Sequence, residues 1–254
     1  MILAIDIGNT NIVIGCIDQQ KTYFVERLRT DASKTALEYA LDLKNVLELY
    51  GITKADLEGS IVASVVPPVS TTIFQAMEKV TGKKPLMVGP GVRTGLNIKV
   101  DNPGSVGADL IVAAVAAVRD YPAPLIIIDM GTATTMTVVD GNGNYIGGVI
   151  IPGLQVALDS LVNRAAQLTK ISLDTPKRVI GKNTLECMQS GSLHGTAAMI
   201  DGMIGRMEEE LGCPATVVAT GGLARFVIPL CQRPILFDDD LLLKGLWIIY
   251  QKNQ

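Results

Sequence analysis

The sequence reads Ile5-Asp6-Ile7-Gly8-Asn9-Thr10-Asn11 near its start and Ile128-Asp129-Met130-Gly131-Thr132-Ala133-Thr134 near its middle. Each stretch is an apolar run, an aspartate and a glycine turn, and the two aspartates lie 129 minus 6, or 123, residues apart in a chain of 254. Such a pattern is also common in ordinary strand-to-hairpin turns. The order of predicted strands around both stretches repeats, however, so we favour an internal duplication with lobes over residues 1–118 and 119–254.

Hydrophobic periodicity predicts that each half opens with a three-stranded meander and continues with alternating helices and strands, which gives an α/β fold with mixed sheets flanked by helices. The first half is expected to have strands over 2–7, 12–17, 21–29, 59–65 and 85–88, and helices over 36–50, 68–80 and 105–119. The second half is expected to have strands from 125, over 136–139, 145–151 and 215–219, and helices over 154–168, 183–211 and 241–251.

The long predicted helix over 183–211 contains four glycines, at Gly191, Gly195, Gly202 and Gly205. Each glycine lowers helix stability by roughly 1 kcal/mol. We therefore expect a close backbone approach at this helix, either between lobes or at a dimer face.

Composition excludes several partners. The chain has 22 Lys plus Arg against 25 Asp plus Glu, a net charge of -3, and no basic cluster, so neither nucleic acid nor a membrane surface is expected. The start reaches an acid at Asp6 without a basic segment before it, which argues against a signal peptide and favours a cytoplasmic protein.

The residues available for acid–base chemistry are few. His194 is the single histidine, and the four cysteines form no C-x-x-C pair, so zinc sites of usual spacing and catalytic triads are disfavoured. If the protein is an enzyme, its acid or base is expected to be a carboxylate.

The two glycine turns fit nucleotide chemistry. Glycine, asparagine and threonine in a tight turn present backbone N–H groups and hydroxyls that can hold phosphate oxygens. Asp6 and Asp129, each at a strand end, can share a hard cation, and a third turn at Thr220-Gly221-Gly222 leaves room for a flat base. The spacings of the P-loop and of the dinucleotide-binding fingerprint do not occur.

Six motifs in order resemble those of the type III pantothenate kinases, over about residues 1–250. They are Asp6-Ile7-Gly8-Asn9-Thr10-Asn11, Pro90-Gly91-Val92-Arg93-Thr94-Gly95-Leu96, Asn102-Pro103-Gly104-Ser105-Val106-Gly107-Ala108-Asp109, Asp129-Met130-Gly131-Thr132-Ala133-Thr134-Thr135, Gly147-Gly148-Val149-Ile150-Ile151-Pro152-Gly153 and Ala219-Thr220-Gly221-Gly222-Leu223-Ala224. The resemblance implies duplicated ribonuclease H-like lobes, as in the acetate kinase, sugar kinase, Hsp70 and actin superfamily.

The resemblance also implies an activity and its ligands. It implies ATP-dependent phosphorylation of pantothenate to 4'-phosphopantothenate, the first step of coenzyme A biosynthesis, by a homodimer with a shared active site that uses Mg²⁺ and a monovalent cation, K⁺ or NH₄⁺. The residues implied for ATP are Asp6, Ile7, Gly8, Asn9, Thr10, Asn11, Ile12, Val13 and Thr132, and those implied for substrate are Gly107, Ala108, Asp109, Leu110 and Thr184. Asp129 is implied for the monovalent cation, Asp6 for magnesium, and Asp109 as the catalytic base.

The residues themselves give Asp109 a plausible chemistry. If Ser105 caps the helix over 105–119, Asp109 lies near its first turn, where the positive end of the helix dipole keeps the carboxylate ionised. The alternative is an acid that only stabilises a helix start.

The sequence departs from the family pattern at two positions, one within the segment implied for the substrate and one before it. The family has arginine where this chain has Leu110, and often an aromatic residue where it has Val100. Loss of a bidentate charged contact can cost about 2–3 kcal/mol. Two alternatives therefore stay open: a nucleotide-binding relative with weak or no pantothenate kinase activity that acts as a regulatory or accessory protein, and a kinase for a related alcohol.

Overall fold

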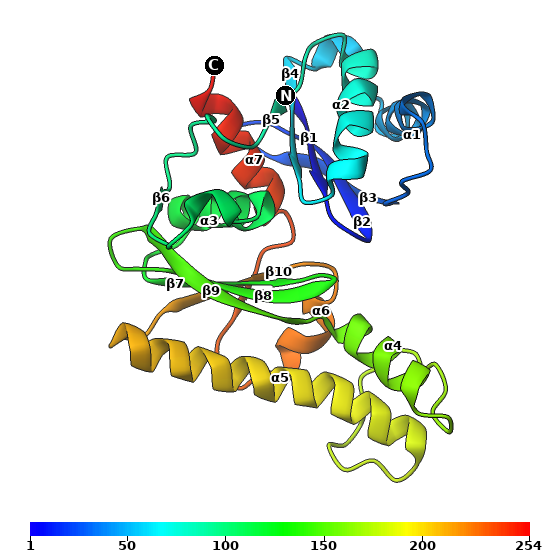
Figure 1. The fold of residues 1–254 in the computed structure, drawn as a ribbon, viewed down its shortest axis with the longest axis vertical. Helices are drawn as coiled ribbons and strands as arrows, with labels where there is room; N and C mark the ends of the chain where they lie inside the picture. Colours follow the sequence, from blue (N-terminus) through cyan, green and yellow to red (C-terminus); the bar gives the residue numbers. More distant parts are fainter. The chain divides into compact units, whose positions relative to one another are not determined.

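The computed structural model describes residues 1–254, which form two compact units (Figure 1). Unit 1 consists of Met1–Asn97, Asp101–Arg119 and Asp240–Gln254, and unit 2 consists of Ile98–Val100 and Asp120–Asp239. Every helix is either too short or too polar to cross a lipid bilayer.

Unit 1 is built on a five-stranded mixed sheet with the order β3-β2-β1-β4-β5. Its strands are β1 (Ile2–Ile7), β2 (Asn11–Ile17), β3 (Thr22–Arg29), β4 (Gly59–Ser64) and β5 (Leu86–Met87). Its helices are α1 (Ala36–Leu49), α2 (Pro67–Thr81), α3 (Ala108–Asp120) and α7 (Leu241–Lys252).

Both faces of this sheet are covered, and alternation along β1 divides its side chains between them. Leu3, Ile5 and Ile7 pack into a core shared with α1 and α2. Ile2 and Ala4 pack into a second core, which is shared with α3 and α7. A strand buried on both faces reads as a continuous apolar run, which is why Ile2–Ile7 carries no polar side chain until Asp6.

Unit 2 contains a six-stranded mixed sheet with the order β11-β10-β7-β8-β9-β6. Its strands are β6 (Asn97–Ile98), β7 (Leu125–Met130), β8 (Ala133–Val139), β9 (Asn144–Pro152), β10 (Thr216–Thr220) and β11 (Leu236–Phe237). Its helices are α4 (Leu154–Arg164), α5 (Thr184–Leu211) and α6 (Ala224–Val227). Alternate side chains of β7, those of Ile126, Ile128 and Met130, pack into a hydrophobic core with α5 and α6.

The two sheets repeat one topology. The order β3-β2-β1-β4-β5 corresponds to β9-β8-β7-β10-β11, with antiparallel pairing on one side of β1 and β7 and parallel pairing on the other. Asp6 pairs with Val13, seven residues on, whereas Asp129 pairs with Thr135, six residues on. The structure therefore confirms the duplicated α/β fold and shows that the second hairpin is one residue shorter.

The C-terminal helix belongs to unit 1, although the sequence division assigned residues 119–254 to the second lobe. Leu243, Leu246 and Ile249 of α7 are fully buried with β1 and β4. Gly245 permits the close packing, because a Cβ atom there would overlap the carbonyl oxygen of Val112 on α3. The burial of its apolar side chains therefore places α7 in unit 1, although it follows unit 2 in the sequence.

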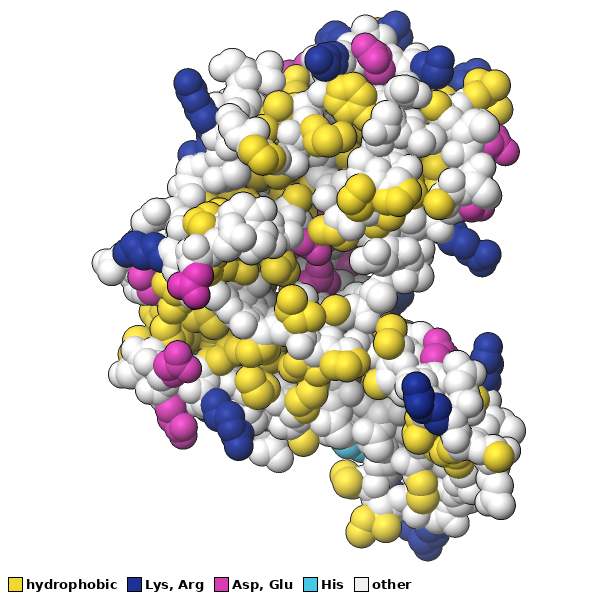
Figure 2. All heavy atoms as spheres, in the orientation of Figure 1, with side chains coloured by type: hydrophobic (Ala, Val, Ile, Leu, Met, Phe, Trp, Pro, Cys, Tyr) yellow, Lys and Arg dark blue, Asp and Glu magenta, His cyan; other side chains and the backbone are white.

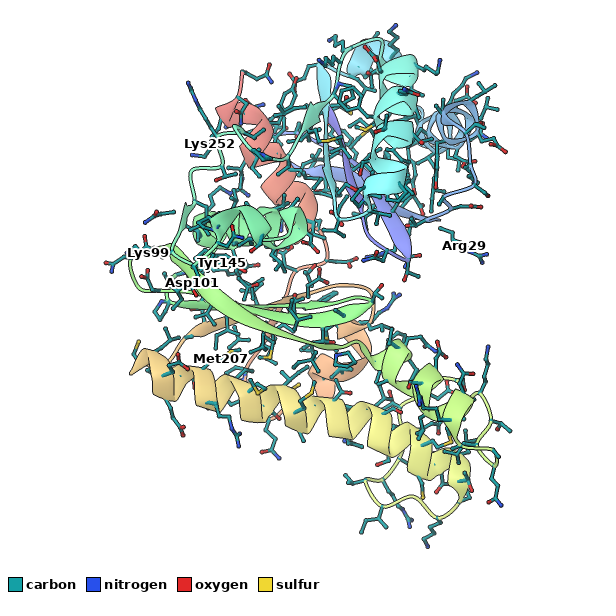
Figure 3. All side chains as sticks on the ribbon, in the orientation of Figure 1. Arg29, Lys99, Asp101, Tyr145, Met207 and Lys252 are labelled. Carbon is teal, nitrogen blue, oxygen red and sulfur yellow. The ribbon has the colours of Figure 1, made fainter.

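The Pro90–Leu96 motif is tied to the end of α7. Arg93 donates its N–H to Oδ1 of Asn253 at 3.0 Å, and Nδ2 of Asn253 donates to the carbonyl of Arg93 at 2.9 Å. Lys252, labelled in Figure 3, precedes this clamp. The motif therefore has a structural role in joining the segment after β5 to the last helix.

The glycines of α5 do not meet another backbone within the chain. A Cβ atom at Gly191, Gly195 or Gly205 would find no atom within 4 Å, and one at Gly202 would meet only the side chain of Arg206. The expected close approach is therefore absent inside the chain, and these positions leave an open helix surface.

Charged side chains of both signs are distributed over the face of the molecule shown in Figure 2. Basic and acidic side chains are scattered there among apolar ones.

Candidate active site

The first glycine turn closes the hairpin between β1 and β2. The N–H of Gly8 donates to the carbonyl of Asn11 at 3.0 Å, and a Cβ atom at Gly8 would lie only 3.0 Å from that oxygen. Asn9, Thr10 and Asn11 are exposed at the tip of the hairpin. Asp6, at the end of β1, is only 7% exposed.

Not every residue implied for ATP offers its side chain. Ile7 and Ile12 are fully buried in the core formed with α1 and α2, and Val13 packs against the opposite core. These three residues can contribute backbone groups and can shape the turn. The polar part is Gly8–Asn11, where phosphate-binding turns usually present their donors.

Thr30, which sequence reasoning did not single out, forms two hydrogen bonds to this turn. Its Oγ1 donates to the carbonyl of Gly8 at 2.7 Å, and its N–H donates to the carbonyl of Thr10 at 3.0 Å. Nothing in the local sequence marks the residue, because its relation to the turn depends on the pairing of β2 with β3. The strand pairing identifies Thr30, because Asn11 lies opposite Arg29 and Thr30 is the residue that follows Arg29.

The second turn lies between β7 and β8, and it places Asp129 beside the third turn. Gly131 donates to the carbonyl of Ala133 at 3.0 Å, and Thr132 is exposed at the tip. Asp129 pairs with Thr220 of β10, and Gly221 follows with a φ of +95°. The turns at Gly131 and Gly221 therefore both lie next to the partly buried carboxylate of Asp129.

The motif ending in Pro152-Gly153 supports the second turn. Gly153 donates its N–H to the carbonyl of Thr132 at 3.0 Å. A Cβ atom there would overlap the carbonyl oxygens of Gly131 and Thr132, so only glycine allows this approach. The requirement for glycine at this motif thus follows from contact with the turn.

The segment Gly107–Leu110, which the resemblance implies for the substrate, forms the start of α3. The first helical bond runs from the N–H of Ile111 to the carbonyl of Gly107 at 3.2 Å. The expectation that Ser105 caps this helix is wrong, because Pro103–Ser105 forms a separate 3-10 turn in which Ser105 Oγ donates to the carbonyl of Asn102. Asp109 nevertheless lies in the first turn of α3, as expected.

The carboxylate of Asp109 is folded back over its own helix start. Its Oδ1 accepts a hydrogen bond from the N–H of Leu110 at 2.8 Å. A Cβ atom at Gly107 would overlap the same oxygen, so the missing side chain at Gly107 makes room for the carboxylate. Ala108 and Leu110 flank it and are partly buried.

Burial raises the pKa of Asp109 above its usual value of 3.8, and the hydrogen bond from Leu110 opposes this shift without cancelling it. Burial is therefore an influence on this carboxylate that the argument from the helix dipole did not include. A raised pKa makes the ionised group more basic and a better proton acceptor. The environment therefore suits a general base better than a purely structural acid.

Val65 connects the first turn and the segment Gly107–Leu110. Its N–H donates to the carbonyl of Ile7 at 3.1 Å, and its Cγ1 atom lies 3.7 Å from the position of a Cβ atom at Gly107. The C-terminal ends of β1 and β4 are adjacent, so the turn after Asp6 and the start of α3 lie at one edge of the unit 1 sheet. Open α/β sheets bind ligands at this edge.

Thr184 lies elsewhere in unit 2. It is the exposed first residue of α5 and lines a groove of about 610 Å³ between α4 and α5. The lining includes Leu154, Leu158, Met188 and Met199, and neither Asp129 nor Thr132 is part of it. Asp6 and Asp109 belong to unit 1, whereas Asp129, Thr132 and Thr184 belong to unit 2.

The site has carboxylates suited to hard cations but no compact cluster of them. No group of three His, Cys, Asp or Glu side chains is positioned to hold a metal ion. Mg²⁺ in phosphoryl-transfer sites is usually held by one or two carboxylates together with substrate phosphates and water. Single carboxylates at Asp6 and Asp129 fit that arrangement and do not fit a metal site made only of protein ligands.

Comparison with solved structures defines the class of protein. A Baf family transcriptional activator described as putative, from Campylobacter jejuni, superposes with a TM-score of 0.59 at 17% identity, covering 99% of this chain and 98% of that one. A ROK family glucokinase from Streptomyces griseus superposes with a TM-score of 0.52 at 12% identity, covering 98% of each. The chain therefore shares its fold with these two proteins.

Comparison with sequences identifies the family within this class. The type III pantothenate kinase family model matches residues 2–206. A type III pantothenate kinase from Exiguobacterium sp. (strain ATCC BAA-1283 / AT1b) is 46% identical over 254 residues, which is 100% of both chains. The chain belongs to the type III pantothenate kinase family.

Proposed function

We infer that this protein is a pantothenate kinase, which phosphorylates pantothenate with ATP to give 4'-phosphopantothenate at the first step of coenzyme A biosynthesis. Family membership over the full chain supports the activity. The observation on which the chemistry rests is the partly buried carboxylate of Asp109, at the sheet edge that also carries the turn after Asp6. No observation favours an inactive relative or a kinase for another alcohol.

ATP is proposed to bind along the two equivalent turns. The exposed Gly8–Asn11 turn would present donors to phosphate oxygens, with the rest of Asp6–Val13 shaping it, and Thr132 would contact ATP from the second turn. ATP supplies the phosphoryl group and a stable leaving group. Phosphoryl transfer needs mainly positioning and charge neutralisation, which such turns can provide without a histidine.

Cations are proposed to complete the charge balance. Asp129 would bind the monovalent cation, K⁺ or NH₄⁺, because its Oδ1 lies beside both glycine turns, 4.0 Å from the position of a Cβ atom at Gly131 and 2.6 Å from one at Gly221. Asp6, at the equivalent position of the first half, would take part in binding Mg²⁺. Its low exposure suits an indirect role, in which it orients a water bound to the ion.

Asp109 is proposed as the base for the acceptor alcohol. As the alcohol oxygen bonds to the γ-phosphorus, the bond from that phosphorus to the bridging oxygen breaks, ADP leaves and the alcohol proton passes to Asp109. Gly107, Ala108 and Leu110 would line the acceptor position around this carboxylate. Leu110 offers an alkyl chain where the family has arginine, so the carboxylate of pantothenate needs another partner.

A homodimer is proposed to complete the acceptor site through Thr184. The groove of about 610 Å³ between α4 and α5, together with the open surface at Gly191 and Gly195, gives a second chain an apolar surface beside Thr184. Gly195→Arg should produce monomers in sedimentation and lower activity, whereas Gly205→Arg on the same helix, outside the groove, serves as a matched control.

The test of the proposed function is a coupled assay for ADP with pantothenate and Mg²⁺, with and without K⁺. We expect turnover that needs pantothenate and rises with K⁺. A folded protein that binds ATP and makes no ADP would contradict the activity. Turnover with pantothenol, the alcohol that lacks the carboxylate, but not with pantothenate would support the related-alcohol reading.

A further inference from the structure

Thr30 lies beside the first glycine turn and is not among the residues proposed to bind a ligand. It makes two hydrogen bonds to the Gly8–Asn11 turn, one from its side chain and one from its backbone. We propose that Thr30 is a positioning residue that locks the first glycine turn in its nucleotide-binding conformation. The proposal rests on the proposed function only in taking this turn as an ATP site.

The two bonds fix the direction of peptide groups in the turn. A trans peptide is planar, so its carbonyl and the following N–H point in opposite directions. The carbonyl of Gly8 is directed at Thr30 Oγ1, which leaves the N–H of Asn9 pointing away from Thr30. A turn that presents an N–H group to phosphate gains from having this orientation set before the ligand arrives.

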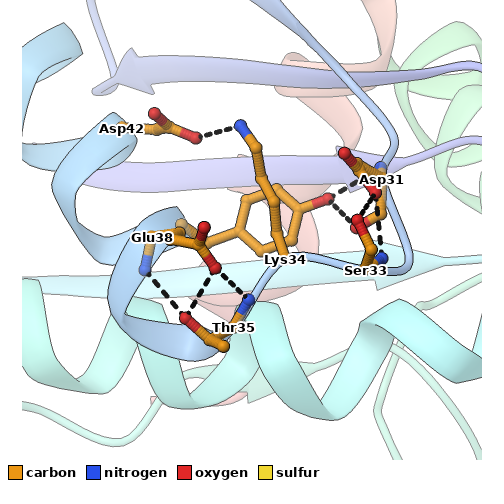
Figure 4. Close-up of polar contacts among 7 residues, drawn as sticks. Asp31, Ser33, Lys34, Thr35, Glu38 and Asp42 are labelled. Atoms are coloured by element: carbon orange, nitrogen blue, oxygen red, sulfur yellow. Dashed lines mark hydrogen bonds and ion pairs between the residues drawn. The ribbon is translucent and has the colours of Figure 1, made fainter.

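The loop that follows Thr30 is held by further hydrogen bonds. The hydroxyl of Tyr39 accepts from the N–H of Asp31 at 2.9 Å and donates to the carbonyl of Asp31 at 2.8 Å, and Tyr39 is fully buried. The side chain of Asp31 accepts from both the N–H and the hydroxyl of Ser33 (Figure 4). The backbone next to Thr30 is therefore anchored to α1.

The same loop is fixed again at the start of α1. Thr35 and Glu38 form a capping box, and Lys34 pairs with Asp42 at 2.8 Å (Figure 4). Such bonds satisfy the free N–H groups of the first helical turn and limit its fraying. Thr30 thus connects the turn to a helix whose start is well anchored.

The second half contains the equivalent contact. Gly153 lies 123 residues after Thr30, and its N–H donates to the carbonyl of Thr132 just as the N–H of Thr30 donates to that of Thr10. Gly153 has no side chain and packs directly against the turn, whereas Thr30 adds a hydroxyl. The recurrence in both halves indicates that bracing the turn belongs to the duplicated unit, and that the hydroxyl bond is particular to the first turn.

The experiment compares Thr30→Val with Thr30→Ser. Valine keeps the shape and removes the hydroxyl, and serine keeps the hydroxyl and removes a methyl group. ATP affinity is measured by calorimetry with Mg²⁺, and KM for ATP and for pantothenate by the coupled assay. We expect Thr30→Val to weaken ATP binding and to raise KM for ATP about tenfold, with KM for pantothenate within about twofold, and Thr30→Ser to restore ATP affinity.

Two further variants make the readout specific. Thr22→Val removes a hydroxyl bond to Asp240 at the opposite end of β3, so it should leave ATP affinity unchanged. Tyr39→Phe removes both bonds to Asp31 and should weaken ATP binding in the same direction. Because Tyr39 acts through Thr30, its effect should be smaller in the Thr30→Val background than in the native one.

Three results would overturn the proposal. They are unchanged ATP affinity in Thr30→Val, equal weakening in Thr30→Val and Thr30→Ser, and equal weakening in Thr30→Val and Thr22→Val. Calorimetry needs no turnover, so this test is independent of the acceptor. A native protein that binds ATP without phosphorylating pantothenate would contradict the proposed function. The ATP affinities of the variants would still test the role of Thr30.

Discussion

Gly221 lies against the carboxylate of Asp129: a Cβ atom at position 221 would sit 2.6 Å from Asp129 Oδ1 and 2.7 Å from both backbone polar atoms of Met130. Gly221 also has a φ of +95°, which an L side chain rarely adopts. Two independent constraints thus require glycine where the third turn meets the carboxylate proposed for the monovalent cation.

Gly221→Ala should therefore disturb Asp129 without touching unit 1. We expect a loss of about 1–3 kcal/mol in stability from backbone strain, and a weaker response of activity to K⁺. Gly222→Ala is the matched control, because a Cβ atom there meets nothing within 4 Å and its φ is not positive. Denaturant unfolding and a K⁺ titration of activity measure both effects, and equal behaviour of the two variants would contradict the prediction.

Gly107→Ala should displace the proposed base. Its new Cβ would overlap Oδ1 of Asp109, so the carboxylate must rotate away from its position over the helix start. We expect kcat to fall at least about tenfold with ATP affinity retained. Gly104→Ala, three residues earlier, meets its nearest atom at 3.6 Å and should keep native activity. Native kcat in Gly107→Ala would argue that the present position of the carboxylate is unimportant.

Asp109→Asn keeps the shape of the side chain and removes its ability to take a proton. We expect kcat to fall about 10²- to 10⁴-fold, the usual range for loss of a general base. ATP affinity, measured by calorimetry, should stay native because the nucleotide turns are untouched. A variant that retains native kcat would exclude Asp109 as the base.

The raised pKa of Asp109 also has a stability consequence. A carboxyl group whose pKa is higher in the folded state stabilises the fold below its unfolded pKa, and this contribution is lost as pH rises through the folded value. Asp109→Asn should therefore be more stable than the native protein at neutral pH, and its advantage should shrink as pH falls towards 4. Denaturant unfolding at two pH values measures the difference, and a less stable variant at neutral pH would contradict the shift.

Leu110→Arg should strengthen acceptor binding. Leu110 is partly buried beside Asp109, and a guanidinium there could hold the substrate carboxylate by a bidentate contact. We expect KM for pantothenate to fall about tenfold, with KM for ATP unchanged. Leu110→Met, which adds no charge, is the control. An unchanged KM for pantothenate would mean that another cation already holds that carboxylate.

Much of the fold follows from local pattern. The alternation and length of apolar runs predicted β1, β2, β3 and most helices to within a few residues, because each element buries a regular face. The repeat of Asp6 and Asp129 predicted the duplication. The start of α3 was less predictable, since Asn102-Pro103-Gly104-Ser105 contains a helix-capping residue that the 3-10 turn uses instead.

The sequence by itself determined the family, the duplicated topology and the candidate carboxylates, because motifs and periodicity are local properties of the chain. Only the tertiary structure decided that α7 packs in unit 1, that burial raises the pKa of Asp109, and that Thr30 hydrogen-bonds to the first turn. Each of these depends on which side chains meet after folding. Packing and desolvation act between residues far apart in sequence, and no local pattern records them.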